Sequence, residues 1–180
     1  PDGTHAAMTP AVPRSSGKLS RHLRINDRVS EGNVDLLFIG DSITSGWESR
    51  GPKVWDKFYG KRNANNLGIG GDRTQHVIWR LNNGNIKGIS PKTAVVMIGT
   101  NNSRDNTPEQ IADGVTVIVN QLRSNLPKTK VLLLAIFPRG AKDDERRRVN
   151  QKANAIFSKL ADGDHIHYLD IGPQFMSNDG

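Results

Sequence analysis

Five short apolar runs are spaced along the chain, with longer mixed stretches between them. The runs occupy residues 34–39, 63–67, 93–98, 131–137 and 165–171, and apolar runs of this length that end at turn residues indicate buried strands. The mixed stretches predict helices over residues 18–30, 73–81, 107–126 and 143–160, with a short irregular helix within 47–59. Nearly continuous apolar strands that alternate with helices are typical of a parallel sheet covered on both faces. The pattern therefore predicts an α/β fold, a three-layer α/β/α sandwich with a five-stranded parallel sheet.

The domain boundary follows from length and composition. Residues 1–17 are rich in Pro, Gly, Ser and Ala, which is typical of a flexible segment. With 180 residues the chain is large enough for one substantial core. We expect a flexible N-terminal arm over residues 1–17 and a single folded domain over residues 18–180.

The composition also narrows the class of protein. The chain has no cysteine, which excludes disulfides and thiolate metal sites but does not fix the compartment. No run approaches the roughly 18–20 apolar residues of a membrane span, and no apolar signal core is visible. We therefore expect no membrane span, and secreted, periplasmic and cytoplasmic locations all stay open.

The formal net charge is +7, and its densest cluster is Arg146-Arg147-Arg148. A basic balance can indicate nucleic-acid binding. Three acids, Asp143, Asp144 and Glu145, directly precede the arginines, an order that suits the helix dipole and pairing along a helix face. Binding of single-stranded nucleic acid would also require aromatic side chains on which bases stack, and none accompany the charge. The cluster is interpreted as a solvated helix face, and no nucleic-acid partner is expected.

The first strand ends in a segment that can carry chemistry, Ile39-Gly40-Asp41-Ser42-Ile43. A serine in a tight turn at the carboxyl end of a parallel strand lies at the sheet edge where open α/β folds place their active sites. Such a serine is a nucleophile if a base removes its proton. Asp-Ser is also a favoured helix cap. Taken alone, the segment favours the cap.

Two further strand ends change that balance. Gly70-Gly71-Asp72 and Asn101-Asn102 each follow an apolar stretch, so their donors are expected on the same sheet edge as Ser42. Gly71 has no Cβ to keep a substrate away from its N–H, and the Asn101 amide offers N–H donors. With the Ser42 N–H they make a candidate three-donor oxyanion hole. Each segment alone would be a turn, cap or polar loop, but three matching strand ends favour an active site.

Longer motifs connect these strand ends to a known family. They are Gly68-Ile69-Gly70-Gly71-Asp72-Arg73-Thr74-Gln75-His76 with Trp79-Arg80-Leu81, then Gly99-Thr100-Asn101-Asn102, then Phe137-Pro138-Arg139-Gly140. From about Arg21 to its last residue the chain resembles the SGNH (GDSL) hydrolases. Within them it is similar to the branch of platelet-activating-factor acetylhydrolase catalytic subunits and bacterial esterases.

The resemblance implies a flavodoxin-like strand order, 2-1-3-4-5, and assigns roles to the strand ends. Ser42 is the implied nucleophile, and Gly71 and Asn101 join its N–H as oxyanion donors. Asp41, Asp72 and Asn102 are expected to support them. Asn102 stands where many relatives carry Asp, as it does in the acetylhydrolase-like branch. The chemistry needs no metal and no organic cofactor, and the implied substrate is a small-molecule ester with a short acyl group, acetyl first.

The family carries its catalytic Asp and His in an Asp-x-x-His block before a closing helix. The sequence stops at Gly180, before that block is expected. The catalytic Asp and His are therefore predicted to be absent from these residues. The closing helix is predicted to be absent as well, and its absence would leave apolar surface exposed near the first strand. The missing segment as a separate chain, or a homo-oligomer, stays an open possibility.

A partial match, Asp162-Gly163-Asp164-His165, precedes the fifth strand. It should therefore lie at the wrong end of that strand, roughly 17–20 Å from the catalytic edge. His76 is expected inside a helix, and His167 alternates with apolar neighbours on a strand. None of these histidines is a good candidate for the base.

Two functional hypotheses follow. The leading one is a serine esterase that works through an acyl-enzyme. The alternative is a non-catalytic binding or assembly protein on the same fold, which has the nucleophile and oxyanion donors but lacks the general base.

Overall fold

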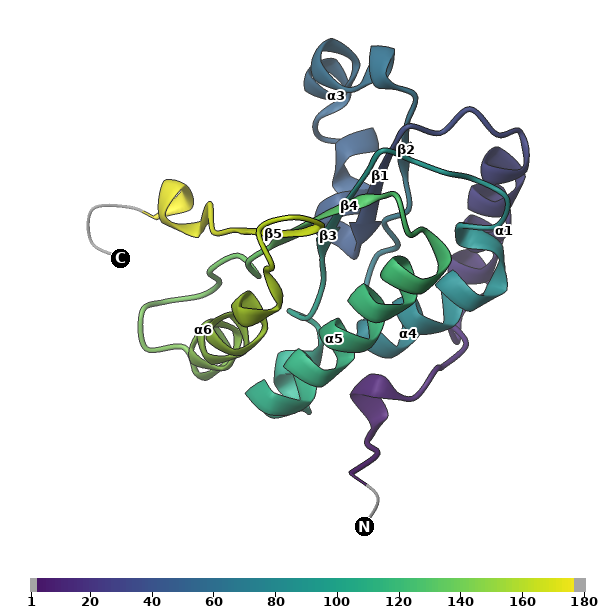
Figure 1. Cartoon of the computed structure of the whole chain (residues 1–180). Coiled ribbons are helices and arrows are strands. Elements are labelled where there is room, and N and C mark those ends of the chain that lie inside the picture. The colour runs from purple at the N-terminus through teal and green to yellow at the C-terminus, as the bar shows by residue number, and fades with distance from the viewer. Residues whose placement is uncertain (1–2, 177–180) are drawn as a thin grey trace.

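A computed structural model describes residues 3–176 of the chain. Its centre is a sheet of five parallel strands in the order β2-β1-β3-β4-β5 (Figure 1). The strands are β1 (Leu36–Gly40), β2 (Ala64–Asn66), β3 (Thr93–Met97), β4 (Lys130–Leu134) and β5 (Ile166–Leu169). This confirms the predicted fold class and the strand order implied by the family resemblance.

The described residues contain six α-helices, of which α1 precedes the first strand and the others lie between strands. The helices are α1 (Ser16–Ser30), α2 (Ser42–Ser45), α3 (Pro52–Phe58), α4 (Thr74–Arg80), α5 (Pro108–Asn125) and α6 (Glu145–Phe157). The predicted start of α5 is confirmed, because Thr107 and Gln110 form a reciprocal capping box. Asp144 caps α6 by accepting from the main chain of Arg146 and Arg147.

One face of the sheet is closed by four helices. Alternate strand residues such as Leu37, Val96 and Leu133 are buried in one core with side chains of α1, α4, α5 and α6. Figure 1 shows these helices together on one side of the sheet. They fix the strands at the edge where the chain leaves β1 and β3.

The opposite face is covered mainly at β1. There Phe38 packs against Trp55 and Tyr59 from the α3 region. Further along, Leu134 of β4 is half-buried, and its β5 neighbour Leu169 is 45% exposed. The exposed apolar strand surface therefore lies at β4 and β5, and the prediction that placed it near the first strand was wrong.

The segment before α1 was expected to be a flexible arm. Its described part, residues 3–15, lies against α4 and α5. Ala7 is fully buried, and its carbonyl accepts from the Thr74 hydroxyl at 2.7 Å. His5 Nε2 is 3.0 Å from the Asp113 carboxylate. Gly114 of α5 makes room for this contact, since a Cβ there would lie 2.6 Å from the Ala7 carbonyl.

The basic cluster on α6 is not the solvated face that the sequence predicted. Arg148 is exposed and pairs with Glu145 at 2.6 Å. Arg146 is half-buried and donates to the Thr100 carbonyl, and Arg147 is buried. Charge order along a helix does not say which side of the helix faces the sheet, and here the side carrying Arg147 packs inward.

Candidate active site

Ser42 is the first residue of α2 and is exposed, directly after the carboxyl end of β1. Asp41 forms the cap of this short helix, since its carboxylate accepts from the Ile43 main chain at 2.9 Å. The helix-cap role and the exposed position of Ser42 are thus both present in one turn. A side chain in this place is open to a substrate from solvent.

The chain that leaves β2 passes close beside this turn. A Cβ at Gly68 would lie 2.9 Å from the Asp41 carbonyl and 2.8 Å from the Thr44 carbonyl carbon, so only glycine permits the approach. Arg21 of α1 holds the same point, since its Nε donates to the Gly68 carbonyl at 2.6 Å. Two residues on, a Cβ at Gly70 would be 3.9 Å from the Ser42 Cβ. The loop after β2 is therefore adjacent to Ser42.

Gly71 follows in this loop with a left-handed φ of +74°. This conformation costs little for glycine and is strained for other residues. Gly71 is exposed, and no residue described by the structure accepts a hydrogen bond from its N–H. Its amide is therefore available to an incoming oxygen.

Asn101 reaches the same loop from the end of β3. Its side-chain nitrogen donates to the Asp72 carbonyl at 2.9 Å. An amide nitrogen carries two hydrogens, so one remains for a ligand. Ser42, Gly71 and Asn101 thus come from three strand ends and meet around the loop of residues 70–72.

Asn102 lies directly beneath, fully buried in a polar network. Its side-chain oxygen Oδ1 accepts from the Thr74 main-chain N–H at 3.0 Å, and its side-chain nitrogen donates to the Gln75 side chain at 3.1 Å. This network ties the start of α4 to the end of β3. Asn102 therefore supports the position of its neighbour Asn101.

Asp72 is buried beside the loop and pairs with Arg80. The Arg80 Nε lies 2.8 Å from Asp72 Oδ2, and both side chains are fully buried. Burial raises the pKa of Asp72 and lowers that of Arg80, while their mutual attraction opposes both shifts. Arg80 also donates to Asn85. The ion pair anchors the loop to α4 from below.

Comparison with known proteins shows the family to which the chain belongs. The GDSL-like Lipase/Acylhydrolase family matches residues 38–180. Platelet-activating factor acetylhydrolase IB subunit alpha2 of Rattus norvegicus is 37% identical over 186 residues, which cover 99% of this chain and 79% of that protein. The chain belongs to the GDSL-like lipase/acylhydrolase family. It is accordingly a carboxylic ester hydrolase by family.

Other relatives of this GDSL-like hydrolase agree. The alpha1 subunit of the same acetylhydrolase from Pongo abelii is 36% identical, over 90% of this chain and 69% of that protein. Among solved structures, a carbohydrate acetylesterase from Sinorhizobium meliloti superposes with a TM-score of 0.65 at 20% identity, over 82% of this chain and 88% of the other. The structural match shows the shared fold.

Lys18 enters the site of this GDSL-like hydrolase from α1, and sequence reasoning missed it. A Cβ at Gly71 would lie 3.0 Å from the Lys18 Nζ, and that nitrogen is 3.7 Å from Asp72 Oδ1. The same oxygen of Asp72 is buried and has no hydrogen-bond partner. No motif signals Lys18, because it lies about fifty residues before the loop that it contacts and only the fold brings them together.

His76 is the histidine nearest to this loop in sequence, and it lies in α4 as predicted. Its Nδ1 accepts from the Arg73 main chain at 3.1 Å. Burial, together with the charges of Lys18, Arg73 and Arg80, lowers the pKa of His76 to about 4. The ring is therefore neutral at pH 7, and its 3.9 Å approach to Asp72 is not an ion pair.

The other histidines also have partners elsewhere. His22 stacks on Trp79 and contacts Asn26 and Asn85, and His5 contacts Asp113. His165 pairs with Asp164 before β5, and His167 is exposed on β5. Among residues 3–176 no histidine is hydrogen-bonded to Ser42.

The described residues lack two features of other protein classes. No helix within them is both long and apolar enough to cross a membrane. No three His, Cys, Asp or Glu side chains in the same part of the chain gather where they could hold a metal ion.

Proposed function

We propose that this GDSL-like hydrolase is a serine esterase that cleaves short-chain, acetyl-type esters through an acyl-enzyme. The observation that carries the proposal is the meeting of Ser42, Gly71 and Asn101 around the loop of residues 70–72. Ser42 Oγ attacks the ester carbonyl and forms the acyl-enzyme as the alcohol leaves. Water then attacks the acyl-enzyme and releases the acid.

The proposed oxyanion hole consists of the Ser42 and Gly71 main-chain N–H groups and the Asn101 amide. Donors fixed before the reaction stabilise the charge that develops on the carbonyl oxygen without reorganisation. Asp72, held by Arg80 and by Asn101, keeps the loop in place. Asp41 keeps Ser42 at the start of α2.

The general base is not among the five histidines of this sequence. Each of these histidines contacts a group other than Ser42. The neutral His76 accepts a main-chain hydrogen bond through Nδ1. We propose that the base belongs to the Asp-x-x-His block that the family resemblance predicts after residue 180. The alcohol part of the substrate could be a sugar, a lysolipid or another alcohol, since the relatives include acetylhydrolases and a carbohydrate acetylesterase.

The lack of a base among the described residues also favours a second function. A protein with this site and no base would bind ligands or partners, alone or as an oligomer, without turning over esters. The two functions differ in one measurable property, which is turnover.

The test compares p-nitrophenyl acetate with the hexanoate ester, using the wild type, Ser42→Ala and Ser45→Ala. Ser45 lies in the same turn and serves as the matched control. The proposal expects turnover of the acetate above the hexanoate, loss of turnover in Ser42→Ala and retention in Ser45→Ala. Since losing a triad member can leave only 10³–10⁴-fold over water, the assay is also run with a peptide carrying the family's Asp-x-x-His block. Turnover that is absent with and without the peptide would support the binding function instead.

A further inference from the structure

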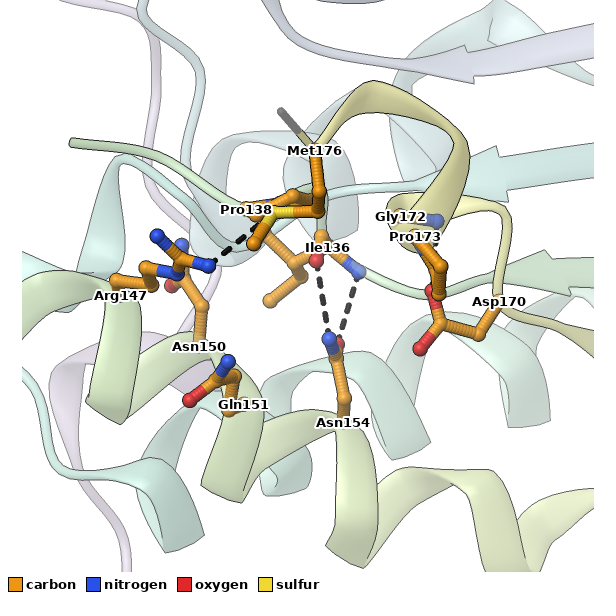
Figure 2. A pocket seen from close by; sticks show the side chains of 10 residues that line it. All are labelled: Ile136, Pro138, Arg147, Asn150, Gln151, Asn154, Asp170, Gly172, Pro173 and Met176. Atoms are coloured by element: carbon orange, nitrogen blue, oxygen red, sulfur yellow. Dashed lines mark hydrogen bonds between the residues drawn. The ribbon is translucent and has the colours of Figure 1, made fainter. Parts of the chain in front are cut away.

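A cavity of about 300 Å³ opens beyond the carboxyl ends of β4 and β5, against α6 (Figure 2). Its wall is partly apolar, from Ile136, Pro138 and Met176. Its polar side chains include Arg147, Asn150 and Asp170. None of these residues belongs to the site around Ser42.

Arg147 is a buried cation without an acidic partner among the described residues. The residue is 4% exposed, and no carboxylate in residues 3–176 lies within ion-pair distance of its guanidinium. Within residues 3–176 its Nε has no acceptor, and its Nη2 donates at 3.1 Å to the sulfur of Met176, which is a weak acceptor. Removing a cation from water is costly unless an anion pairs with it. The guanidinium therefore has unused capacity for an anion.

Asn150 adds a second unsatisfied group on the same wall. It is 1% exposed, and its Oδ1 has no hydrogen-bond partner. Its nitrogen donates to the Thr100 hydroxyl at 3.3 Å. Thr100 directly precedes Asn101 in sequence, so the cavity is linked to the candidate active site through one side-chain contact.

We propose that this cavity binds a ligand carboxylate, which pairs with the guanidinium of Arg147. A guanidinium presents its N–H groups as a planar fork that matches the two oxygens of a carboxylate. The apolar wall suits a short alkyl stem, and a water held by the same carboxylate can donate to Asn150 Oδ1. The inference does not depend on ester hydrolysis, because it rests on the unpaired cation and the cavity alone.

Asp170 supplies an internal control. It lines the same cavity, it makes no ion pair with Arg147, and its Oδ1 accepts from the Gly172 main chain at 2.8 Å. Figure 2 shows the two side chains on different sides of the cavity. Its negative charge opposes an anion there, while an asparagine in its place keeps the oxygen that Gly172 needs.

The experiment titrates the 180-residue protein with sodium acetate at constant ionic strength and follows backbone amide NMR shifts. Acetamide, which has the same shape without the charge, is the control ligand. We expect saturable acetate binding that acetamide does not reproduce. Arg147→Met should weaken it at least tenfold, since a charge-assisted hydrogen bond contributes about that much. Asp170→Asn should strengthen it severalfold.

The carboxylate can come from a free acid or from the chain, whose sequence has Asp179 three residues after Met176. Acetate binding to the wild type identifies a free acid. Acetate binding that appears only in Asp179→Asn and is lost on adding Arg147→Met identifies the side chain of the protein. If neither the wild type nor Asp179→Asn binds acetate more tightly than acetamide, the proposal is wrong. If Arg147→Met does not fold, the Asp170→Asn variant provides the test. An acetate affinity no higher than that of the wild type would then contradict the proposal.

Discussion

The side-chain nitrogen of Asn101 lies 2.9 Å from the main-chain oxygen of Asp72. This contact joins the end of β3 to the loop that carries Gly71. It uses one of the two amide hydrogens of Asn101 and leaves the other for a ligand. One side chain thus shapes the loop and, in the proposed mechanism, has a hydrogen left for the oxyanion.

Replacing Asn101 with alanine should lower kcat by about 10²–10³-fold with little change in KM, because the donor acts mainly on the charge of the transition state. Steady-state ester hydrolysis measures both constants. Asn120→Ala, at an exposed position of α5, is the control and should match the wild type. An unchanged kcat in Asn101→Ala would remove this residue from the mechanism.

Gly71→Ala and Gly88→Ala form a matched pair, since both glycines have φ of +74°. A Cβ at Gly88 meets nothing within 4 Å, whereas one at Gly71 meets Lys18. Each substitution should cost about 1–2 kcal/mol of stability from backbone strain, measured by urea unfolding. Only Gly71→Ala should also reduce kcat/KM. Equal activity in the two variants would show that the Gly71 loop does not take part in catalysis.

The buried pair of Asp72 and Arg80 gives a stability prediction. Arg80→Met leaves the Asp72 carboxylate buried without its main partner, which should lower the free energy of unfolding by about 3–5 kcal/mol. Arg148→Met removes an exposed pair with Glu145 and should change it by less than about 0.5 kcal/mol. Urea denaturation compares the two. Similar losses in both variants would contradict the buried geometry.

Asp41 should make stability depend on pH. Burial, with a smaller contribution from the charge of Asp72, raises its pKa from 3.8 to about 6. The folded protein therefore holds this proton more tightly than the unfolded chain, so Asp41 contributes stability at low pH that is lost as pH rises toward 6. Asp41→Asn keeps the cap and cannot titrate. The difference in free energy of unfolding between this variant and the wild type should shift by about 2–3 kcal/mol in favour of the variant as the pH rises from 4 to 7. A constant difference across this range would show that the carboxyl is not shifted.

The Asp162–His165 match should be irrelevant to catalysis. Asp162 accepts three main-chain hydrogen bonds in the turn before β5, and His165 pairs with Asp164. Both residues lie at the end of the sheet opposite Ser42. Ester hydrolysis by Asp162→Ala and His165→Ala should therefore stay near the wild-type rate, and a loss of activity with intact folding would place the active site elsewhere.

Sequence patterns predicted the sheet because its strands are buried on at least one face. The run at 131–137 predicted a longer strand than β4, which ends at Leu134, since apolar periodicity does not distinguish a strand from a buried loop leading to Pro138. Motifs brought out Ser42, Gly71 and Asn101 because each lies in the loop that follows a strand. Lys18 and Arg147 could not be found in this way. Lys18 meets the loop only through tertiary packing. The charged neighbours of Arg147 in sequence predicted a solvent-exposed helix face.

Covalent labelling of Ser42 tests the central claim most directly. The protein, with and without the Asp-x-x-His peptide, is treated with a fluorophosphonate, and the modified residue is located by mass spectrometry after proteolysis. The account predicts a single adduct on the peptide that contains Ser42, absent in Ser42→Ala and retained in Ser45→Ala. An adduct on another residue, or labelling that persists in Ser42→Ala, would contradict it.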